Sequence, residues 1–106
     1  TAVLSETGNP YPQADVASVY VARRQGNGLK KGAIVIINNN DAPKGLWVDS
    51  TPDGWSDWSS QILVNAFDQS QTALVEADGR VWVEAPARGY AVYVLKTDFV
   101  EMDLFR

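Results

Sequence analysis

Residues 78–94, DGRVWVEAPARGYAVYV, contain two short apolar runs separated by a turn with Pro and Gly. In the first run Val81 and Val83 alternate with Trp82 and with polar residues. A period of two is typical of a β-strand with one buried face, so the valines share one face and Trp82 lies on the other. The second run, Tyr90–Val94, has the aromatic and β-branched content that strands favour. We therefore predict two strands here.

Similar signals recur along the rest of the chain. Asp78-Gly79 is a strong hairpin signal, and Asn38–Asp41 is typical of a polar hairpin tip. The run 32–37 is almost continuously β-branched, which predicts a strand buried on both faces. No segment has a helical period over ten or more residues. Further strands are predicted at 18–24, 44–49, 61–67 and 72–76.

These strands predict an all-β fold of seven to eight short strands, either a sandwich or a barrel. The chain has 106 residues, which is the size of one domain. Residues 1–16 contain two prolines and few core-type residues, so we predict a lead-in loop or linker there. The single β-sandwich domain is then expected over residues 17–106, with 95–106 as one more strand or a tether.

Composition excludes several classes of function. The chain has no Cys and no His, which excludes disulfides, cysteine metal sites and nucleophiles activated by histidine. Its net charge is −4 and its nine basic residues are scattered, so neither nucleic acid nor an anionic membrane is an expected partner. No carboxylate pair has the setting that a glycosidase needs. We predict no catalytic residue, no metal site and no cofactor, and therefore a domain that is not itself an enzyme.

Two tryptophans in the segment DGWSDWSS, residues 53–60, suggest a binding surface. Sugars stack their C–H faces on flat aromatic rings, and acidic or hydroxyl side chains bond their hydroxyl groups. On this reasoning Trp55, Trp58 and Asp57 are candidate carbohydrate-binding residues. The alternative is that one or both rings pack at the end of the core, because large aromatic rings are usually mostly buried.

An outward-facing aromatic residue can also mark a contact with another domain. Trp82 lies opposite the buried valines of its strand, and Phe99 lies in the last segment of the chain. We assign both as candidate domain-interface residues. The alternative for Trp82 is a single exposed ring without a partner.

The order of these segments resembles the C-terminal β domain, domain C, of bacterial α-amylases in the α-amylase glycoside hydrolase family. The resemblance rests on VYVARR (19–24), GAIVIINN (32–39), KGLWV (44–48) and, most specifically, DGRVWVEAPARGYAVYV (78–94), and it spans about three quarters of the chain. The family usually has an aromatic-Gly-Glu-Phe type of strand after the Asp-Gly turn, whereas this chain has RVWVE at 80–84. The chain also continues past Val94, where many amylases end.

The resemblance implies an antiparallel Greek-key sandwich that packs on and stabilises a catalytic barrel. The catalytic carboxylates of the family lie on that barrel, so no catalytic residue transfers to this chain. The parent would act on α-glucans such as starch, and an extracellular or cell-surface location in a bacterium would follow. Two other functions stay open, namely a carbohydrate-binding module that uses exposed Trp residues and a structural β domain of a surface protein.

Overall fold

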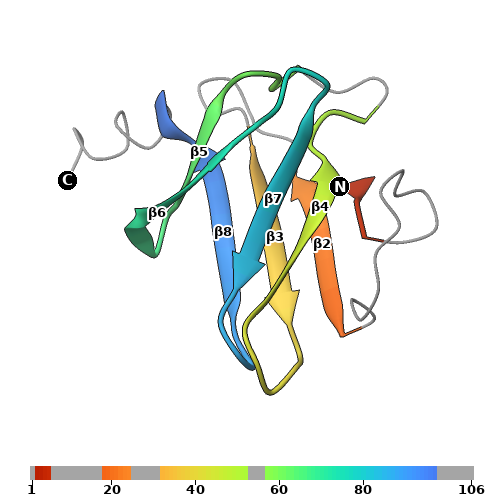
Figure 1. Cartoon of the computed structure of the whole chain (residues 1–106), viewed down its shortest axis with the longest axis vertical. Helices are drawn as coiled ribbons and strands as arrows, with labels where there is room; N and C mark the ends of the chain where they lie inside the picture. Colours follow the sequence, from red (N-terminus) through yellow and green to blue (C-terminus); the bar gives the residue numbers. More distant parts are fainter. Residues whose placement is uncertain (1, 6–17, 25–31, 53–56, 98–106) are drawn as a thin grey trace.

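The computed structural model describes residues 2–5, 18–24, 32–52 and 57–97. Within these ranges the chain forms eight strands and almost no helix, and no helix is long and apolar enough to cross a membrane. The strands are β1 (Ala2–Val3), β2 (Val19–Arg24), β3 (Ala33–Asn38), β4 (Lys44–Asp49), β5 (Ile62–Asn65), β6 (Asp68–Leu74), β7 (Arg80–Ala85) and β8 (Tyr90–Leu95) (Figure 1). The predicted all-β fold is confirmed.

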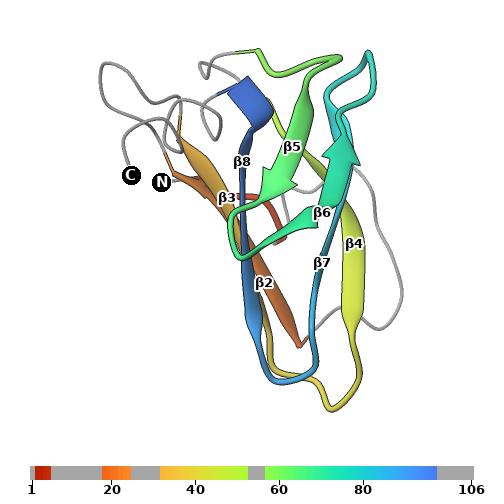
Figure 2. The ribbon, with the colours of Figure 1, turned by 90° about the vertical axis from the view of Figure 1, so that its left-hand side faces the viewer.

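The strands form two layers. A six-stranded sheet has the order β1-β2-β3-β8-β5-β6, and β4 and β7 form a second, two-stranded sheet. Figure 2 shows the β4–β7 layer facing the layer of β2, β3 and β8. All the strand pairs are antiparallel. The fold is therefore sandwich-like and antiparallel, while the Greek-key arrangement stays a prediction.

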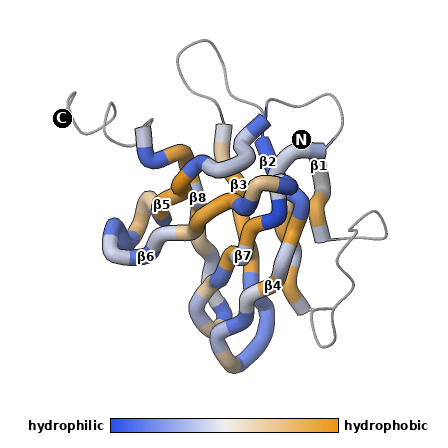
Figure 3. The backbone as a smooth tube through the Cα atoms, turned by 45° about the horizontal axis from the view of Figure 1, so that its top comes forward, coloured by the Kyte–Doolittle hydropathy of each residue, from blue (hydrophilic) through white to orange (hydrophobic). Residues whose placement is uncertain are grey.

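The core lies between the two layers and is built from alternate residues of each strand. Ile34 and Ile36 of β3 are fully buried, as are Val81 and Val83 of β7. Successive side chains of a strand point to opposite faces, so these residues face inward together. Figure 3 shows hydrophobic segments where β3, β7 and β8 lie together and hydrophilic residues in the turn between β3 and β4. The alternation predicted for β7 is thus confirmed.

The predicted lead-in segment contains part of the sheet. Ala2 and Val3 of β1 pair with Ala22 and Arg23 of β2, and Leu4 is buried in the core at 6 % exposure. The prediction of a loop or linker is therefore wrong for residues 2–5, where a two-residue strand is too short for a detectable period. The rest of that segment, residues 6–16, lies outside the described residues, as do residues 98–106.

The predicted hairpins at Asn38–Asp41 and at Asp78-Gly79 are turns between the two layers. The first joins β3 of the large sheet to β4 of the small one, and the second joins β6 of the large sheet to β7 of the small one. Gly79 has a φ of 91°, a left-handed conformation that glycine adopts without strain. The turn residues were thus identified correctly, but the strands that flank each turn pair with other strands.

Asn38 links the turn between β3 and β4 to the turn that follows β7 by side-chain hydrogen bonds. Its side chain is 2 % exposed, and its amide nitrogen donates to the carbonyl oxygens of Ala42, Ala85 and Pro86 at 2.9, 3.3 and 3.1 Å. Its amide oxygen accepts the backbone N–H of Asn40 at 2.9 Å. One side chain therefore satisfies buried backbone groups of the β3–β4 turn and of the turn that follows β7.

Tyr93 of β8 makes a second buried hydrogen-bonded contact between the two layers. Because its phenol is titratable, we predict that this contact makes stability depend on pH. Its hydroxyl donates to the carbonyl oxygen of Glu84 at 3.0 Å and accepts the Glu84 N–H at 3.2 Å. Burial raises the pKa of Tyr93 above its ordinary value of 10. The neutral phenol is favoured by folding, so its contribution to stability is present below pH 10 and is lost as the pH rises through the folded pKa.

We expect Tyr93→Phe to lower the free energy of unfolding by about 1 kcal/mol at pH 7, because both hydrogen bonds are lost. The difference between wild type and variant should shrink above pH 10, where the wild-type phenol ionises. Urea titrations of both proteins between pH 7 and pH 11 measure it. A difference that stays constant across this range would contradict the assignment.

Candidate functional site

Trp58 lies in the core, so the prediction that its ring contacts sugar is wrong. The side chain is 1 % exposed, and the guanidinium carbon of Arg23 sits 3.8 Å from the ring centroid. Arg23 itself is fully buried and donates to the carbonyl oxygen of Ser50 at 2.6 Å. Burial lowers the pKa of Arg23 to about 10, against the attraction of Asp49, so the side chain stays protonated at neutral pH. Packing, the alternative for Trp58, is what the structure shows.

Asp57 is the other described residue of the predicted sugar site, and its carboxylate is engaged in a turn. Asp57 is exposed, and its carboxylate accepts the backbone N–H of Ser59 at 2.8 Å. Hydrogen bonds from the Ser59 side chain and backbone lower the pKa of the Asp57 carboxyl. This is the usual role of Asp in a turn. Trp55 lies outside the described residues, so its assignment stays a prediction.

The outer face of the large sheet carries a row of exposed apolar side chains. Tyr20 of β2 lies opposite Ile37 of β3, and Ile37 lies opposite Tyr90 of β8. Phe67, in the turn between β5 and β6, packs edge-on against Tyr90 with ring centroids 5.4 Å apart. Their exposures are 40 %, 47 %, 59 % and 66 % in the order Tyr20, Ile37, Tyr90, Phe67. We call these four residues the apolar row.

The apolar row has further apolar neighbours on the same face. The next cross-strand set along the sheet has Val35 of β3 and Val92 of β8, which are partly exposed, whereas Ala22 of β2 in the same set is buried at 3 % exposure. Single exposed apolar residues are ordinary, but side chains that adjoin across three strands form a patch. The patch lies on the side of the large sheet away from the small one.

Sequence reasoning missed the apolar row because it assigned β3 to a strand buried on both faces. That assignment is wrong for Ile37, which is 47 % exposed. A continuous β-branched run shows only that both faces are apolar, and it does not show that something covers both. The sequence does contain a sign of the row, because the strands on both sides of β3 carry a tyrosine. The register that places Tyr20, Ile37 and Tyr90 side by side cannot be read from the sequence.

The outer face of the small sheet carries a different cluster, centred on Trp82. Trp82 pairs with Trp47 across the two strands, and their rings are 5.7 Å apart at 66°. The Trp82 indole N–H donates to the Glu84 carboxylate at 2.9 Å, and the Arg80 guanidinium lies 4.7 Å from the Trp47 ring centroid. The predicted orientation of Trp82, away from the valines, is confirmed. Its role as an interface residue stays a prediction, and Phe99 lies outside the described residues.

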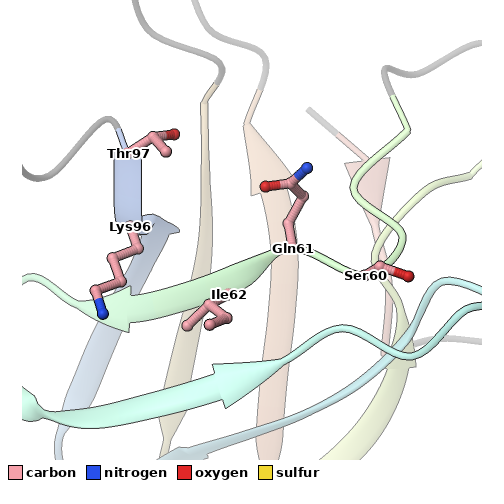
Figure 4. Close-up of a pocket in the computed structure, with 5 residues that line it drawn as sticks. All are labelled: Ser60, Gln61, Ile62, Lys96 and Thr97. Atoms are coloured by element: carbon pink, nitrogen blue, oxygen red, sulfur yellow. The ribbon is translucent and has the colours of Figure 1, made fainter.

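Two surface pockets lie beside these faces. One, of about 450 Å³, is lined by Ser60, Gln61, Ile62, Lys96 and Thr97, next to the end of β8 (Figure 4). The other, of about 330 Å³, lies at the margin of the apolar row and includes Phe67, Tyr90 and Glu84 among its lining residues. Among the described lining residues, the first pocket has one ionisable side chain, Lys96, and the second has Glu84 and Tyr90.

A scan against protein-family models and a search of curated proteins returned no match to this chain. The structure establishes the fold as an all-β antiparallel sandwich of two layers, with one apolar and one tryptophan-bearing outer face. These comparisons therefore assign neither a family nor a function to the chain.

Proposed function

We propose that this chain is a non-catalytic accessory domain of an α-amylase-like glycoside hydrolase. It packs on a catalytic barrel through the apolar row, and the parent enzyme acts on α-glucans such as starch. The observation that carries the proposal is the row itself, because four large apolar side chains at 40–66 % exposure gain stability when a partner removes them from water.

Two features support a neighbouring protein domain as the occupant. The row is carried mainly by paired strands of a sheet, which makes a broad and rigid surface of the kind that interdomain contacts use. It also contains two tyrosines, and aromatic residues are enriched at protein interfaces. The choice of a barrel as that domain rests on the resemblance of residues 18–94 to domain C of the family.

Nitration of tyrosine tests the proposal, because it reports which phenol rings are accessible. We expect Tyr20 and Tyr90 to react readily with tetranitromethane in the isolated chain. In the polypeptide that joins the chain to its catalytic barrel, mass spectrometry should find both tyrosines protected by at least about tenfold. Tyr93 is an internal control, because at 1 % exposure it should be unreactive in both proteins.

Equal reactivity of Tyr20 and Tyr90 in the two polypeptides would contradict the proposal. So would a neighbouring coding sequence without a (β/α)₈ pattern, since that would remove the barrel. Concentration-dependent dimerisation of the isolated chain that buries Tyr20 and Tyr90, and that persists in the longer polypeptide, would instead identify the row as a contact between copies.

A further inference from the structure

We propose that the outer face of the β4–β7 sheet binds a neutral oligosaccharide, with the Trp82 ring as the surface on which one pyranose unit stacks. We call Trp82, Trp47, Gly45, Arg80 and Glu84 the indole platform. The choice of an α-glucan as the ligand rests on the proposed function, whereas the stacking site rests on the geometry of these residues.

The Trp82 ring packs over its own sheet beside the Glu84 side chain. A Cβ atom on Gly45 would lie 2.7 Å and 2.8 Å from atoms of the indole, so the ring occupies the space above this glycine. An aromatic ring that covers a glycine on the neighbouring strand stabilises a sheet. Trp82 nevertheless stays partly open to solvent, at 38 % exposure. A partly exposed indole ring offers an apolar surface of the kind on which the C–H face of a pyranose stacks.

The orientation of the ring is fixed before any ligand binds. The indole N–H is bonded to Glu84, and the Trp47 ring packs against Trp82 at 66°. Because these contacts hold the ring in place, little conformational entropy is lost on binding. This arrangement distinguishes Trp82 from a single exposed ring without neighbours.

The polar groups beside the ring suit hydroxyl groups and not a charged ligand. A carboxylate has about four acceptor sites, and the indole N–H of Trp82 occupies one of those on Glu84. Arg80 lies over Trp47, and its guanidinium is 3.8 Å from the Glu76 carboxylate. Two carboxylates, those of Glu84 and Glu76, and one guanidinium, that of Arg80, lie beside the rings, and the charges of Arg80 and Glu76 offset each other. A polyol can donate to Glu84 and accept from Arg80 at once.

The indole platform and the apolar row lie on opposite sides of the molecule. The platform is the outer face of β4 and β7, and the row is the outer face of β2, β3 and β8 (Figure 2). A barrel docked on the row would therefore leave the Trp82 ring open to solvent, while Glu84 lines the pocket at the margin of the row. On this proposal Trp82 contacts sugar and is not the domain-interface residue predicted from the sequence. An accessory domain of this form would hold a glucan chain while attached to the enzyme that cleaves it.

Titration of the ¹⁵N-labelled chain with maltoheptaose tests the proposal. The chain has four Trp residues, and substitution of each assigns its indole N–H resonance. We expect the Trp82 resonance to shift at millimolar ligand. Trp82→Ala should weaken binding measured by calorimetry by at least about tenfold, which corresponds to ~1.4 kcal/mol.

Two further variants separate binding from folding. Trp82→Phe keeps an aromatic ring above Gly45 but removes the N–H bond to Glu84, so it should fold and bind several-fold more weakly. Glu84→Ala leaves the Trp82 ring and should also reduce affinity. Tyr20→Ser, on the opposite face, should bind as the wild type does.

No shift with maltoheptaose would overturn the proposal, and so would a shift confined to the resonance of Trp55. Binding of cellohexaose without binding of maltoheptaose would overturn the α-glucan assignment. The tyrosine nitration experiment is independent of all of these outcomes, because it reports on the other face. If the tyrosines are protected but no sugar binds, the sugar site is refuted and the proposed function is not. If sugar binds but the tyrosines stay reactive, the docking of a barrel on the apolar row is refuted and the sugar site is not.

Discussion

Trp58→Ala is expected to lower the free energy of unfolding by about 3–5 kcal/mol, the range for truncation of a large buried aromatic side chain. The ring is 1 % exposed, so its removal leaves a cavity in the core. It also removes the aromatic surface beneath the buried Arg23 guanidinium. A domain of this size is stable by about 5–15 kcal/mol, so a substantial fraction of the variant could be unfolded at room temperature.

Urea titration followed by far-ultraviolet circular dichroism measures this loss. Trp58→Phe is the matched control, since it keeps a ring below Arg23 and removes an indole N–H that has no hydrogen-bond partner among the described residues. Its cost should be clearly smaller than that of alanine. A loss below about 1 kcal/mol in Trp58→Ala would place the ring outside the core and reopen its assignment as a sugar contact.

Asn38→Asp is expected to cost about 3–5 kcal/mol at pH 7, because it places a buried carboxylate against three carbonyl oxygens. The wild-type amide donates to these oxygens, whereas a carboxylate can only accept. Acid should reduce the deficit. Burial disfavours the charged form of the introduced carboxyl, so the folded variant binds its proton more tightly than the unfolded chain does and gains relative stability as the pH falls.

Thermal or urea unfolding between pH 4 and pH 8 measures both effects. Asn40→Asp is the matched control in the same turn. The amide oxygen of Asn40 accepts the backbone N–H of Ala42 at 3.0 Å, and a carboxylate oxygen can replace it. The control should therefore cost less than about 1 kcal/mol. Similar losses in the two variants would show that Asn38 does not hold the turns together.

The sequence predicted local structure well because that structure depends on neighbouring residues. The strand at 44–49 has the same bounds as β4, and the alternation that sends Val81 and Val83 inward and Trp82 outward is confirmed. The turns at Asn38–Asp41 and at Asp78-Gly79 were found for the same reason, since left-handed backbone favours Asn, Asp and Gly.

Pairing between distant segments could not be predicted in this way. A tight turn reverses the chain, but whether the next strand joins the same sheet or crosses to the other layer depends on which apolar faces meet. The hairpin expected at Asp78-Gly79 failed for this reason, since β7 pairs with β4 and not with β6.

The candidate sites likewise depend on which distant residues meet in space, which the sequence alone does not show. Trp58 was assigned to sugar from its polar neighbours in the chain, but its neighbours in space are Arg23 and the core. The apolar row consists of residues from three strands and one turn, and only the register of the sheet brings these residues together.

The strand order has a consequence for how the molecule is made. The central pair of the large sheet joins β3 to β8, and the small sheet joins β4 to β7, so each layer is closed by segments far apart in the sequence. Long loops must close before these contacts form, and such topologies reach the native state slowly compared with helical bundles. During synthesis β2 can pair with β3 as soon as both have left the ribosome, but the second edge of β3 and the whole of β4 stay unpaired until β8 and β7 follow. The first half of the chain cannot complete its core until β8 has emerged, so this nascent segment is where premature association between chains is most to be expected.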